Sequence, residues 1–284
     1  MAQKPISIRL ISFAINTLSY LNPLLAGQWA VDIFSTPQAK KRRNPEALND
    51  AKRFTISSTV GELSAFSWGQ GEKTIVLMHG WESDATSTAP FIQPLVAAGY
   101  RVVSVDGPAH GDSPGNRANL LKFEAALRAT IAASGDVYAV IGHSFGGAAT
   151  LLALGSQPRL DVERAVIVGA PSQMDHVFAR FTGFLDLNQR VLQSMFAYVE
   201  RNFGRPMHSF NGEHAIRSGI PLMVIHDRTD PIVPFADAEH LVAKIPYAQA
   251  VYTEGLGHRN ILKDQAVIGH VLSFLQPTPV LITQ

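Results

Sequence analysis

The 284-residue sequence contains no cysteine. Disulfides, thiolate zinc sites, iron–sulfur clusters and a cysteine nucleophile are therefore excluded, and the absence is typical of a reducing compartment. The sequence also has no large excess of positive or negative residues, since the formal net charge is only +1. So small a charge does not attract nucleic acid over a distance, and no motif for binding RNA or DNA is found. We therefore expect a cytoplasmic protein without a nucleic-acid partner.

The N-terminal region lacks an uninterrupted apolar run of the kind found in signal peptides and membrane spans. The spacing of Ile8, Ile11, Ile15 and Leu18 predicts an amphipathic helix that residues 29–34 continue. An apolar run here would be interrupted by Asn16, Thr17, Ser19, Asn22 and Pro23. We therefore expect neither a cleaved signal peptide nor a membrane anchor at this end of the chain.

A basic run follows, formed by Lys40, Lys41, Arg42 and Arg43. The alternatives are a solvated linker and a segment that binds a membrane surface. Because the sequence offers no second membrane anchor, we favour the linker and expect no membrane partner.

Short apolar runs recur through the rest of the chain, at 75–78, 102–105, 137–141, 165–168, 222–225 and 250–252. Runs this uniformly apolar are typical of strands covered on both faces, as in a parallel sheet. Segments with helical spacing separate most of them, at 120–131, 238–245 and 268–275. Two weakly alternating segments, 54–56 and 63–68, come first and predict antiparallel strands. The pattern therefore predicts an α/β fold with a mostly parallel central sheet flanked by helices.

The interval from 171 to 220 is too long for a single crossover between strands. It contains aromatic residues at roughly helical spacing, including Phe178, Phe181, Phe184, Phe196 and Phe203. We interpret it as an inserted helical cap. The predicted organisation is a helical N-terminal extension at 1–50, a core at 51–170 and 221–284, and a cap at 171–220. The extension is left with three alternatives: packing along the cap, packing along the sheet edge, or a dimer contact.

Residues that can take part in catalysis follow these strands at their carboxyl ends, where open α/β sheets bind ligands. Ser144 lies in the Gly-His-Ser-Phe-Gly pentapeptide at 142–146, directly after an apolar run. A strand that turns sharply into a helix at this point would expose its hydroxyl. Asp230 and His258 follow two later runs, in the order Ser, Asp, His that such a sheet uses for a catalytic triad.

These motifs together resemble those of the α/β-hydrolases, over about residues 74–274. The similarity lies in the segments VLMHGWES, VDGPAHGDSPG, HDRTDPIVPFAD and EGLGHRNIL. The resemblance implies Ser144 as nucleophile, His258 as general base and Asp230 as the carboxylate that orients it. It also implies an oxyanion hole made by the backbone N–H groups of Trp81 and Phe145. No cofactor and no metal are expected.

Other residues near these motifs have simpler interpretations. Asp227 and Asp237 are alternatives to Asp230, which we prefer because the prolines after it could hold it rigidly. His79 and His110 are expected to brace turns rather than to polarise a substrate, and His143 to pack beneath the Ser144 turn. Arg259 either forms a salt bridge or binds an anionic group of the substrate.

We expect cleavage of a carboxylic ester, or of a related thioester or amide, through an acyl-enzyme. Cap aromatics lining a pocket between cap and sheet would favour a small-molecule substrate with a hydrophobic portion. One alternative keeps the triad but cleaves a carbon–carbon bond or performs perhydrolysis. Another is a non-catalytic ligand-binding homologue. A homo-oligomer remains open.

Overall fold

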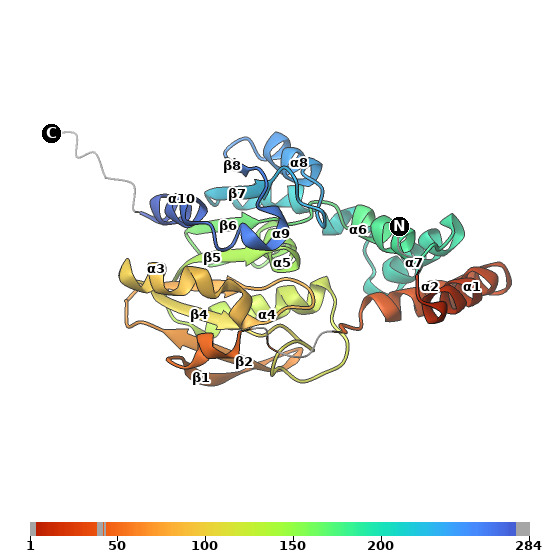
Figure 1. The fold of residues 1–284 in the computed structure, drawn as a ribbon, viewed down its shortest axis with the longest axis horizontal. Coiled ribbons are helices and arrows are strands. Elements are labelled where there is room, and N and C mark those ends of the chain that lie inside the picture. The colour runs from red at the N-terminus through yellow and green to blue at the C-terminus, as the bar shows by residue number, and fades with distance from the viewer. Residues whose placement is uncertain (1–3, 39–41, 43, 277–284) are drawn as a thin grey trace.

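The computed structural model describes residues 4–38, 42 and 44–276. Its centre is an eight-stranded sheet with the strand order β1-β2-β4-β3-β5-β6-β7-β8 (Figure 1). Each predicted apolar run lies in one of the mutually parallel strands β3 (Thr74–Met78), β4 (Arg101–Val105), β5 (Val137–His143), β6 (Arg164–Val168), β7 (Leu222–Asp227) and β8 (Gln249–Thr253). The predicted α/β architecture is therefore confirmed.

Two antiparallel strands open the sheet, also as predicted. β1 (Lys52–Ser58) pairs with β2 (Gly61–Trp68), which in turn runs antiparallel to β4. The last four residues of β2 also pair with β4 and are buried.

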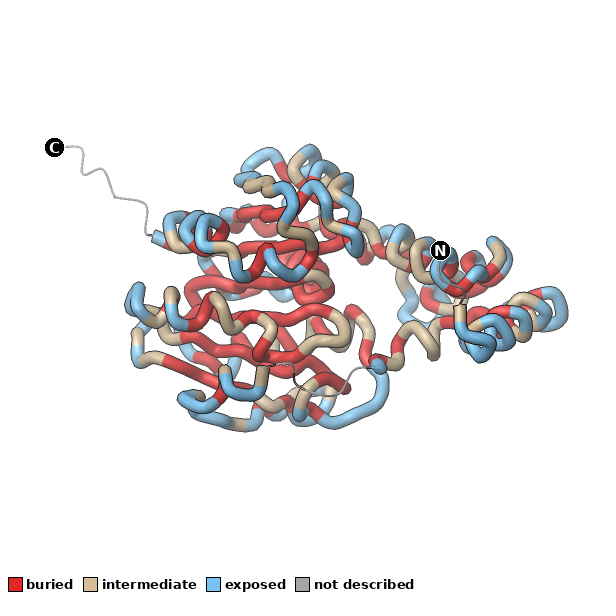
Figure 2. The backbone as a smooth tube through the Cα atoms, viewed as in Figure 1, coloured by how far each residue is buried: buried red, intermediate tan, exposed pale blue. Residues whose placement is uncertain are grey.

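Helices cover both faces of the sheet, which is why successive residues of a central strand are all apolar. In β3, Ile75 and Leu77 pack in the hydrophobic cluster formed with α3 (Ile92–Ala97) and α10 (Gln265–Leu275). Val76 points to the opposite face and packs in the cluster formed with α4 (Leu120–Ala133), α5 (Phe145–Gly155) and α8 (Ala236–Lys244). The central strands are correspondingly buried, whereas β1 and β8 at the two edges of the sheet are mostly exposed or intermediate (Figure 2).

A separate helical lobe lies beyond one end of the sheet (Figure 1). It consists of α6 (Met174–Phe184) and α7 (Gln189–Phe203), inserted between β6 and β7, together with α1 (Ile6–Leu21) and α2 (Pro23–Phe34). Of the three alternatives for the N-terminal extension, the structure shows packing along the inserted helices, since α1 and α2 both contact α7. None of the described helices is long and apolar enough to cross a lipid bilayer.

The N-terminal segment forms two helices rather than the continuous one expected. Asn22 ends α1 and its side chain accepts a hydrogen bond from the N–H of Leu25, which caps α2. Pro23 occupies the first position of α2, where its missing N–H costs no hydrogen bond. The two residues therefore act as the stop signal of one helix and the start signal of the next.

Arg42 corrects the prediction of a solvated basic linker. Its guanidinium is largely buried and pairs with Asp84 (3.3 Å), Asp112 (2.7 Å) and Asp106. Burial acts to lower the pKa of Arg42, but its hydrogen bonds to Asp106 and Asp112 and their charges outweigh burial and raise the pKa. The three other residues of the run, Lys40, Lys41 and Arg43, lie outside the described residues. Arg42 therefore ties the segment after α2 to the loops that follow β3 and β4.

The contact between α2 and α7 depends on Gly27. A Cβ atom on Gly27 would lie 2.3 Å from the backbone oxygen of Ser194. No side chain fits at that separation, so glycine at this position allows the two helix backbones to approach closely.

We predict that Gly27→Val destabilises the folded protein by about 1–3 kcal/mol, because the new side chain forces α2 away from α7. Denaturant unfolding at equilibrium measures the change. Gly183→Ala in α6 is the matched control, since nothing lies within 4 Å of a Cβ atom there. Equal stability of Gly27→Val and wild type would contradict the tight packing.

Candidate active site

Ser144 occupies a strained turn between β5 and α5. Its φ of 52° is in the left-handed region that non-glycine residues rarely adopt. The Ser144 N–H donates to the carbonyl of Val168 (2.9 Å), and the Ser144 carbonyl accepts from the N–H of Ala148 (3.0 Å). Its side chain makes no capping hydrogen bond to α5. The backbone is thus held at both sides of the turn while the hydroxyl stays available.

Ser144 and His258 line the same pocket, which has a volume of about 590 Å³. This volume is in the range usual for small-molecule sites. The apolar part of the lining comes from Trp81, Pro90, Ile232 and Leu262. Polar and charged residues form the rest, among them Asn44, Glu46, Glu82, Ser83, Thr86, Ser87, Arg259 and Lys263. The pocket is therefore more polar than the sequence led us to expect.

His258 contacts Asp230 through a short hydrogen bond. The Nδ1 of His258 lies 2.7 Å from Oδ2 of Asp230. A carboxylate acceptor on Nδ1 requires the proton at that nitrogen, which leaves Nε2 as the basic nitrogen of the neutral ring. Gly169, at the end of β6, lies beside the pair, and a Cβ there would be 3.4 Å from Nδ1. Gly169 was not among the residues expected at the site, although it directly follows the apolar run at 165–168.

The loop that follows β7 fixes Asp230. Its Oδ1 accepts hydrogen bonds from the N–H groups of Ile232 (2.8 Å) and Val233 (2.9 Å). His226 lies beside the carboxylate, 3.7 Å away, and its Nε2 donates to the carbonyl of Val233 (3.0 Å). Burial acts to raise the pKa of Asp230, but the hydrogen bonds from His258 and the loop outweigh it, so the pKa lies below its usual value. Asp230 is therefore ionised at neutral pH.

Ser144 and His258 share the pocket without a direct hydrogen bond between their side chains, as far as the described residues show. Catalytic hydrogen bonds in ligand-free enzymes are often long and shorten only when substrate is bound. The structure thus places the hydroxyl and the imidazole at one site and the carboxylate behind the imidazole.

Two backbone N–H groups border Ser144. Phe145 begins α5, so its N–H has no partner within that helix. Trp81 lines the pocket and follows Gly80, where a Cβ atom would lie only 2.8 Å from Cβ of Ser144. Within the described part of the chain, neither N–H donates to another backbone carbonyl outside regular helices and strands. Both groups are therefore available to an acceptor bound at Ser144.

The two alternative carboxylates have structural partners. Asp227 accepts from Thr229 (Oγ1, 2.6 Å), Thr253 (Oγ1, 2.8 Å) and the N–H of Leu256 (3.0 Å). It therefore joins the loops that present Asp230 and His258. Asp237 accepts from the N–H (2.7 Å) and hydroxyl (2.8 Å) of Ser172, at the start of the inserted segment.

Three further histidines brace the surrounding loops. His79 and His110 each accept a backbone N–H at Nε2, from Gly107 (2.8 Å) and Glu82 (3.1 Å) respectively. Burial lowers the pKa of both rings to about 4, so they are neutral. His143 donates from Nε2 to the carbonyl of His258 (2.9 Å), and burial lowers its pKa to about 3. His143 therefore supports His258 from beneath the turn.

Arg259 and Lys263 form a basic part of the pocket wall. Among the described residues, neither has a carboxylate within salt-bridge distance. The salt bridge considered for Arg259 is therefore not found in that part of the chain. The described residues also contain no group of three His, Asp or Glu side chains placed to hold a metal ion.

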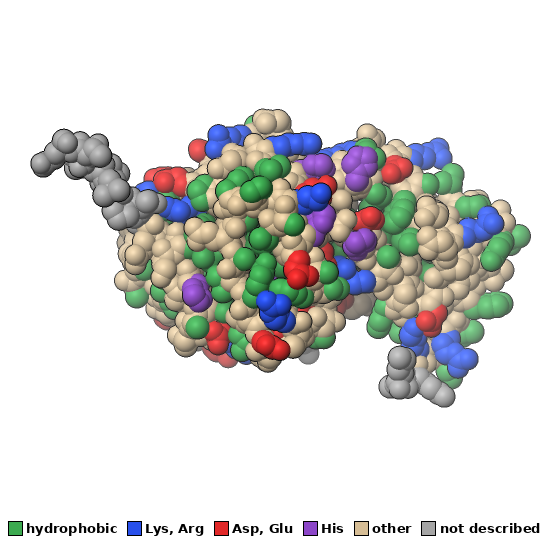
Figure 3. Space-filling view, turned by 90° about the horizontal axis from the view of Figure 1, so that it is seen from above, with side chains coloured by type: hydrophobic (Ala, Val, Ile, Leu, Met, Phe, Trp, Pro, Cys, Tyr) green, Lys and Arg blue, Asp and Glu red, His purple; other side chains and the backbone are tan. Residues whose placement is uncertain are grey.

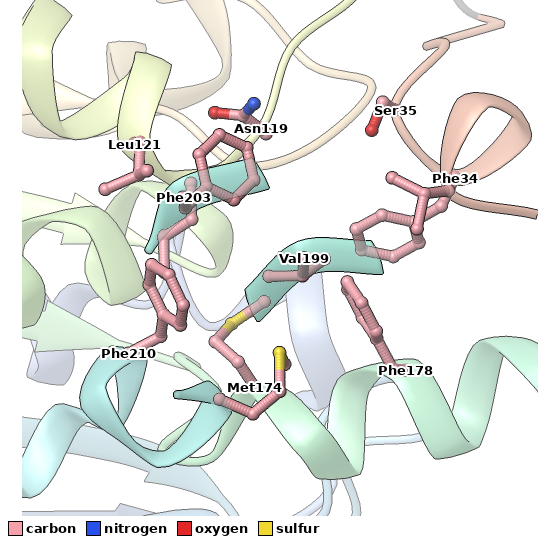
Figure 4. A pocket seen from close by; sticks show the side chains of 12 residues that line it. Phe34, Ser35, Asn119, Leu121, Met174, Phe178, Val199, Phe203 and Phe210 are labelled. Atoms are coloured by element: carbon pink, nitrogen blue, oxygen red, sulfur yellow. The ribbon is translucent and has the colours of Figure 1, made fainter. Parts of the chain in front are cut away.

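Two of the aromatic residues of the inserted helices, Phe178 and Phe203, line a different pocket (Figure 4). This second pocket is almost entirely apolar, has a volume of about 60 Å³ and lies between the helical lobe and the start of α4. Phe178 and Phe203 line it, together with Phe34 of α2. Phe34 also stacks on Trp81, with ring centroids 6.0 Å apart. The Phe34–Trp81 stack therefore separates the apolar pocket from the pocket that holds Ser144.

We predict that Asp227→Asn lowers the stability of the folded protein by about 1–3 kcal/mol at pH 7. Burial acts to raise the pKa of Asp227, but its hydrogen bonds lower it below the usual value. The ionised group therefore stabilises the fold above the unfolded-state pKa of about 4, and this contribution is lost as the pH falls below that value.

Urea unfolding of both proteins between neutral and acid pH tests this prediction. The difference between them should shrink as the pH falls. Asp161→Asn, at an exposed position, should show little difference at any pH. A difference that is independent of pH would contradict the assigned role of Asp227.

Comparison with known proteins identifies relatives of the chain. A model of the alpha/beta hydrolase family matches residues 75–269. A curated relative is the 2-hydroxy-6-oxononadienedioate/2-hydroxy-6-oxononatrienedioate hydrolase of Escherichia coli, 38% identical over 86 residues, which are 28% of this chain. The match spans only 30% of that relative's length.

Solved structures share the fold at low sequence identity. An esterase of Pyrococcus furiosus superposes with a TM-score of 0.65 and 20% identity, covering 85% of this chain and 98% of that one. A bromoperoxidase of Bacillus anthracis gives a TM-score of 0.60 and 18% identity, covering 80% of this chain and 100% of that one. These similarities confirm the predicted α/β-hydrolase fold. Because the family model also matches well over half of the sequence, the chain belongs to the alpha/beta hydrolase family.

Proposed function

We propose that the protein is a serine hydrolase that cleaves a carboxylic ester, or a related thioester or amide, with Ser144, His258 and Asp230 as its triad. The observation that supports this most directly is the 2.7 Å contact between His258 and Asp230 at the pocket that also exposes Ser144. A neutral imidazole held by a buried carboxylate is the base that a serine hydroxyl needs to become a nucleophile.

The reaction proceeds through an acyl-enzyme. Nε2 of His258 takes the proton of Ser144 as Oγ attacks the carbonyl carbon, and Asp230 stabilises the imidazolium that forms. The N–H groups of Trp81 and Phe145 donate to the oxyanion of the tetrahedral intermediate, each contributing about 3–4 kcal/mol. The intermediate then collapses, and the leaving group takes the proton from His258. Water deprotonated by His258 then attacks the acyl-enzyme, the bond between the acyl carbon and Oγ of Ser144 breaks, and His258 returns the proton to Oγ as the acid leaves.

We predict that Ser144→Ala lowers kcat for p-nitrophenyl ester hydrolysis by about 10⁴-fold or more, because no other group supplies the nucleophile. A fluorophosphonate probe should label the wild type at Ser144 and leave the variant unlabelled. Ser156→Ala, outside the pocket, is the control and should be labelled normally. Folded wild-type protein that resists the probe would instead indicate a non-catalytic binding protein.

Cleavage of a carbon–carbon bond by the same triad is the second candidate. The Escherichia coli relative is named as a hydrolase of dioates, and Arg259 and Lys263 on the pocket wall, with which no described carboxylate pairs, suit a substrate with a carboxylate. Turnover of a carboxylated diketone, with p-nitrophenyl esters inert, would favour this candidate. The reverse result would favour the esterase.

We further predict that Phe34→Ala extends the range of acyl chains. Removing Phe34 leaves Trp81 without its stacking partner and opens the Ser144 pocket toward the apolar pocket. The ratio of kcat/KM for octanoyl over butyryl esters should rise about tenfold.

Phe203→Ala is the matched control for this prediction. It enlarges the same apolar pocket without touching the Phe34–Trp81 stack, so the acyl-chain profile should not change. An unchanged profile in Phe34→Ala would show that the two pockets do not join.

A further inference from the structure

The first two helices contain very little charge. Arg9 is the only charged residue between positions 5 and 31, a stretch that covers all of α1 and most of α2. Surface helices of globular proteins usually expose a charged or polar face. Something other than bulk water is therefore expected to contact the outer surface of these helices.

In α1, polar side chains lie on the face toward the protein interior and large apolar side chains lie on the outer face. Its buried residues are Ser12, Ile15 and Ser19, whereas Leu10 and Phe13 are 64% and 72% exposed. The inward position of the polar side chains has a clear cause, since they bond to the loop between α6 and α7.

Those hydrogen bonds fix the orientation of α1. The Ser12 hydroxyl donates to the carbonyl of Leu185 (2.5 Å), and the side-chain oxygen of Asn16 accepts from the N–H of Asn188 (2.8 Å). Asn16 and Ser19, two of the polar residues that made a membrane contact unexpected from the sequence, therefore bond to this loop, whereas Thr17 and Asn22 are exposed. Ile15 is buried on the same side of α1, whereas Leu10, Ile11 and Phe13 are exposed.

The apolar surface continues onto α2. The inner face of α2 uses Ala26, Gly27 and Ala30, which are buried. Phe184, at the end of α6, adds to the surface next to Lys4, whose Nζ lies 5.9 Å from its ring centroid. We call the whole set the outer apolar patch, and it consists of Ile6, Leu10, Ile11, Phe13, Tyr20, Leu21, Leu24, Leu25, Trp29 and Phe184, all more than a third exposed.

We propose that the outer apolar patch docks the protein on the surface of a bilayer containing acidic phospholipids, with α1 and α2 lying in the interfacial plane. Helices of this kind combine a large apolar face with basic and aromatic residues at the headgroup level. Tyr20 and Trp29 supply the aromatic groups.

The charges around the patch favour a lipid surface of negative charge. Arg9 is unpaired among the described residues, and Arg190 lies over the ring of Tyr20, 5.0 Å from its centroid. The acidic residues at the border are already neutralised, since Asp186 pairs with Lys4 (2.6 Å) and Asp32 with Arg117 (2.7 Å). Among the described residues, Arg9 and Arg190 therefore add positive charge that no carboxylate within salt-bridge distance compensates.

The position of the patch favours a bilayer over a second copy of the chain. α1 and α2 form the end of the long axis of the molecule (Figure 1), and apolar side chains are spread over the surface of this lobe (Figure 3). Two narrow ends bury little area against each other, whereas lipid headgroups rearrange around a narrow apolar tip. This docking goes beyond the proposed hydrolysis and does not require it.

Cosedimentation with vesicles of equimolar phosphatidylcholine and phosphatidylglycerol tests the proposal. The wild type should bind, and the double variant Leu10→Gln, Phe13→Gln should bind at least about tenfold more weakly. Arg9→Gln should weaken binding about fivefold at low salt and have no effect on vesicles of phosphatidylcholine alone. Ile216→Gln removes an exposed apolar side chain outside the outer apolar patch, from the short 3₁₀ segment Gly212–Ser218 that contacts α5, and should bind as the wild type does.

Fluorescence gives a second measurement, which reports the position of Trp29 in the bound protein rather than the strength of binding. Brominated lipids should quench Trp29, and Trp29→Phe should abolish the quenching, because Trp68 is buried in the sheet and Trp81 lies at the Ser144 pocket.

Three results would overturn the proposal. One is failure of the wild type to bind vesicles. A second is equal loss of binding in the Ile216 variant. The third is a stable dimer in sedimentation equilibrium that the Leu10/Phe13 variant dissociates, which would assign the patch to a second copy of the chain.

Discussion

The backbone conformation of Ser144 is the constraint on which the site depends. A left-handed residue between a buried strand and a buried helix is strained, and it persists only where the surroundings leave no alternative. Here the surroundings are backbone atoms, since a Cβ atom on Gly146 would lie 2.4 Å from the carbonyl oxygens of Met78 and His79. The turn, the end of β3 and the start of α5 are therefore pressed together as one unit. That unit exposes the hydroxyl and brings Trp81 and Phe145 beside it.

The histidine and carboxylate are positioned by hydrogen bonds rather than by close packing. Asp227 joins the loop after β7 to the loop after β8, and His143 holds the backbone of His258 from below. Two kinds of interaction therefore shape the pocket. Close backbone packing fixes Ser144. Hydrogen bonds fix its proposed partners, His258 and Asp230, and leave their loops exposed enough to adjust to a ligand.

Much of the core was predictable because its signals are local. Each parallel strand is a short apolar run, and the end of each run marks the edge where polar residues gather. The order of Ser144, Asp230 and His258 along the chain then suggested a common site. The pairing of His258 with Asp230 rather than Asp227 could only be argued from the prolines, because all three acidic residues near that loop have plausible partners.

What the sequence did not reveal depends on contacts between distant segments. Arg42 looked solvated because its acidic partners lie 42 or more positions away in the chain, on loops after β3 and β4. The inward polar face of α1 was hidden for the same reason, since the carbonyl that accepts from Ser12 belongs to Leu185. The separation of the apolar pocket from the Ser144 pocket rests on one aromatic pair, Phe34 and Trp81, which no periodicity indicates.

Arg42 has a further consequence for how the N-terminal segment relates to the rest of the protein. Asn44 and Glu46, just beyond it, are part of the wall of the Ser144 pocket, while α1 and α2 before it form half of the helical lobe. A shortened form beginning near residue 50 would thus lose one side of the Ser144 pocket and expose the side of α7 that packs on α1 and α2. The N-terminal segment therefore completes both the Ser144 pocket and the helical lobe. A protein engineered from the α/β core alone would need another segment to cover these surfaces.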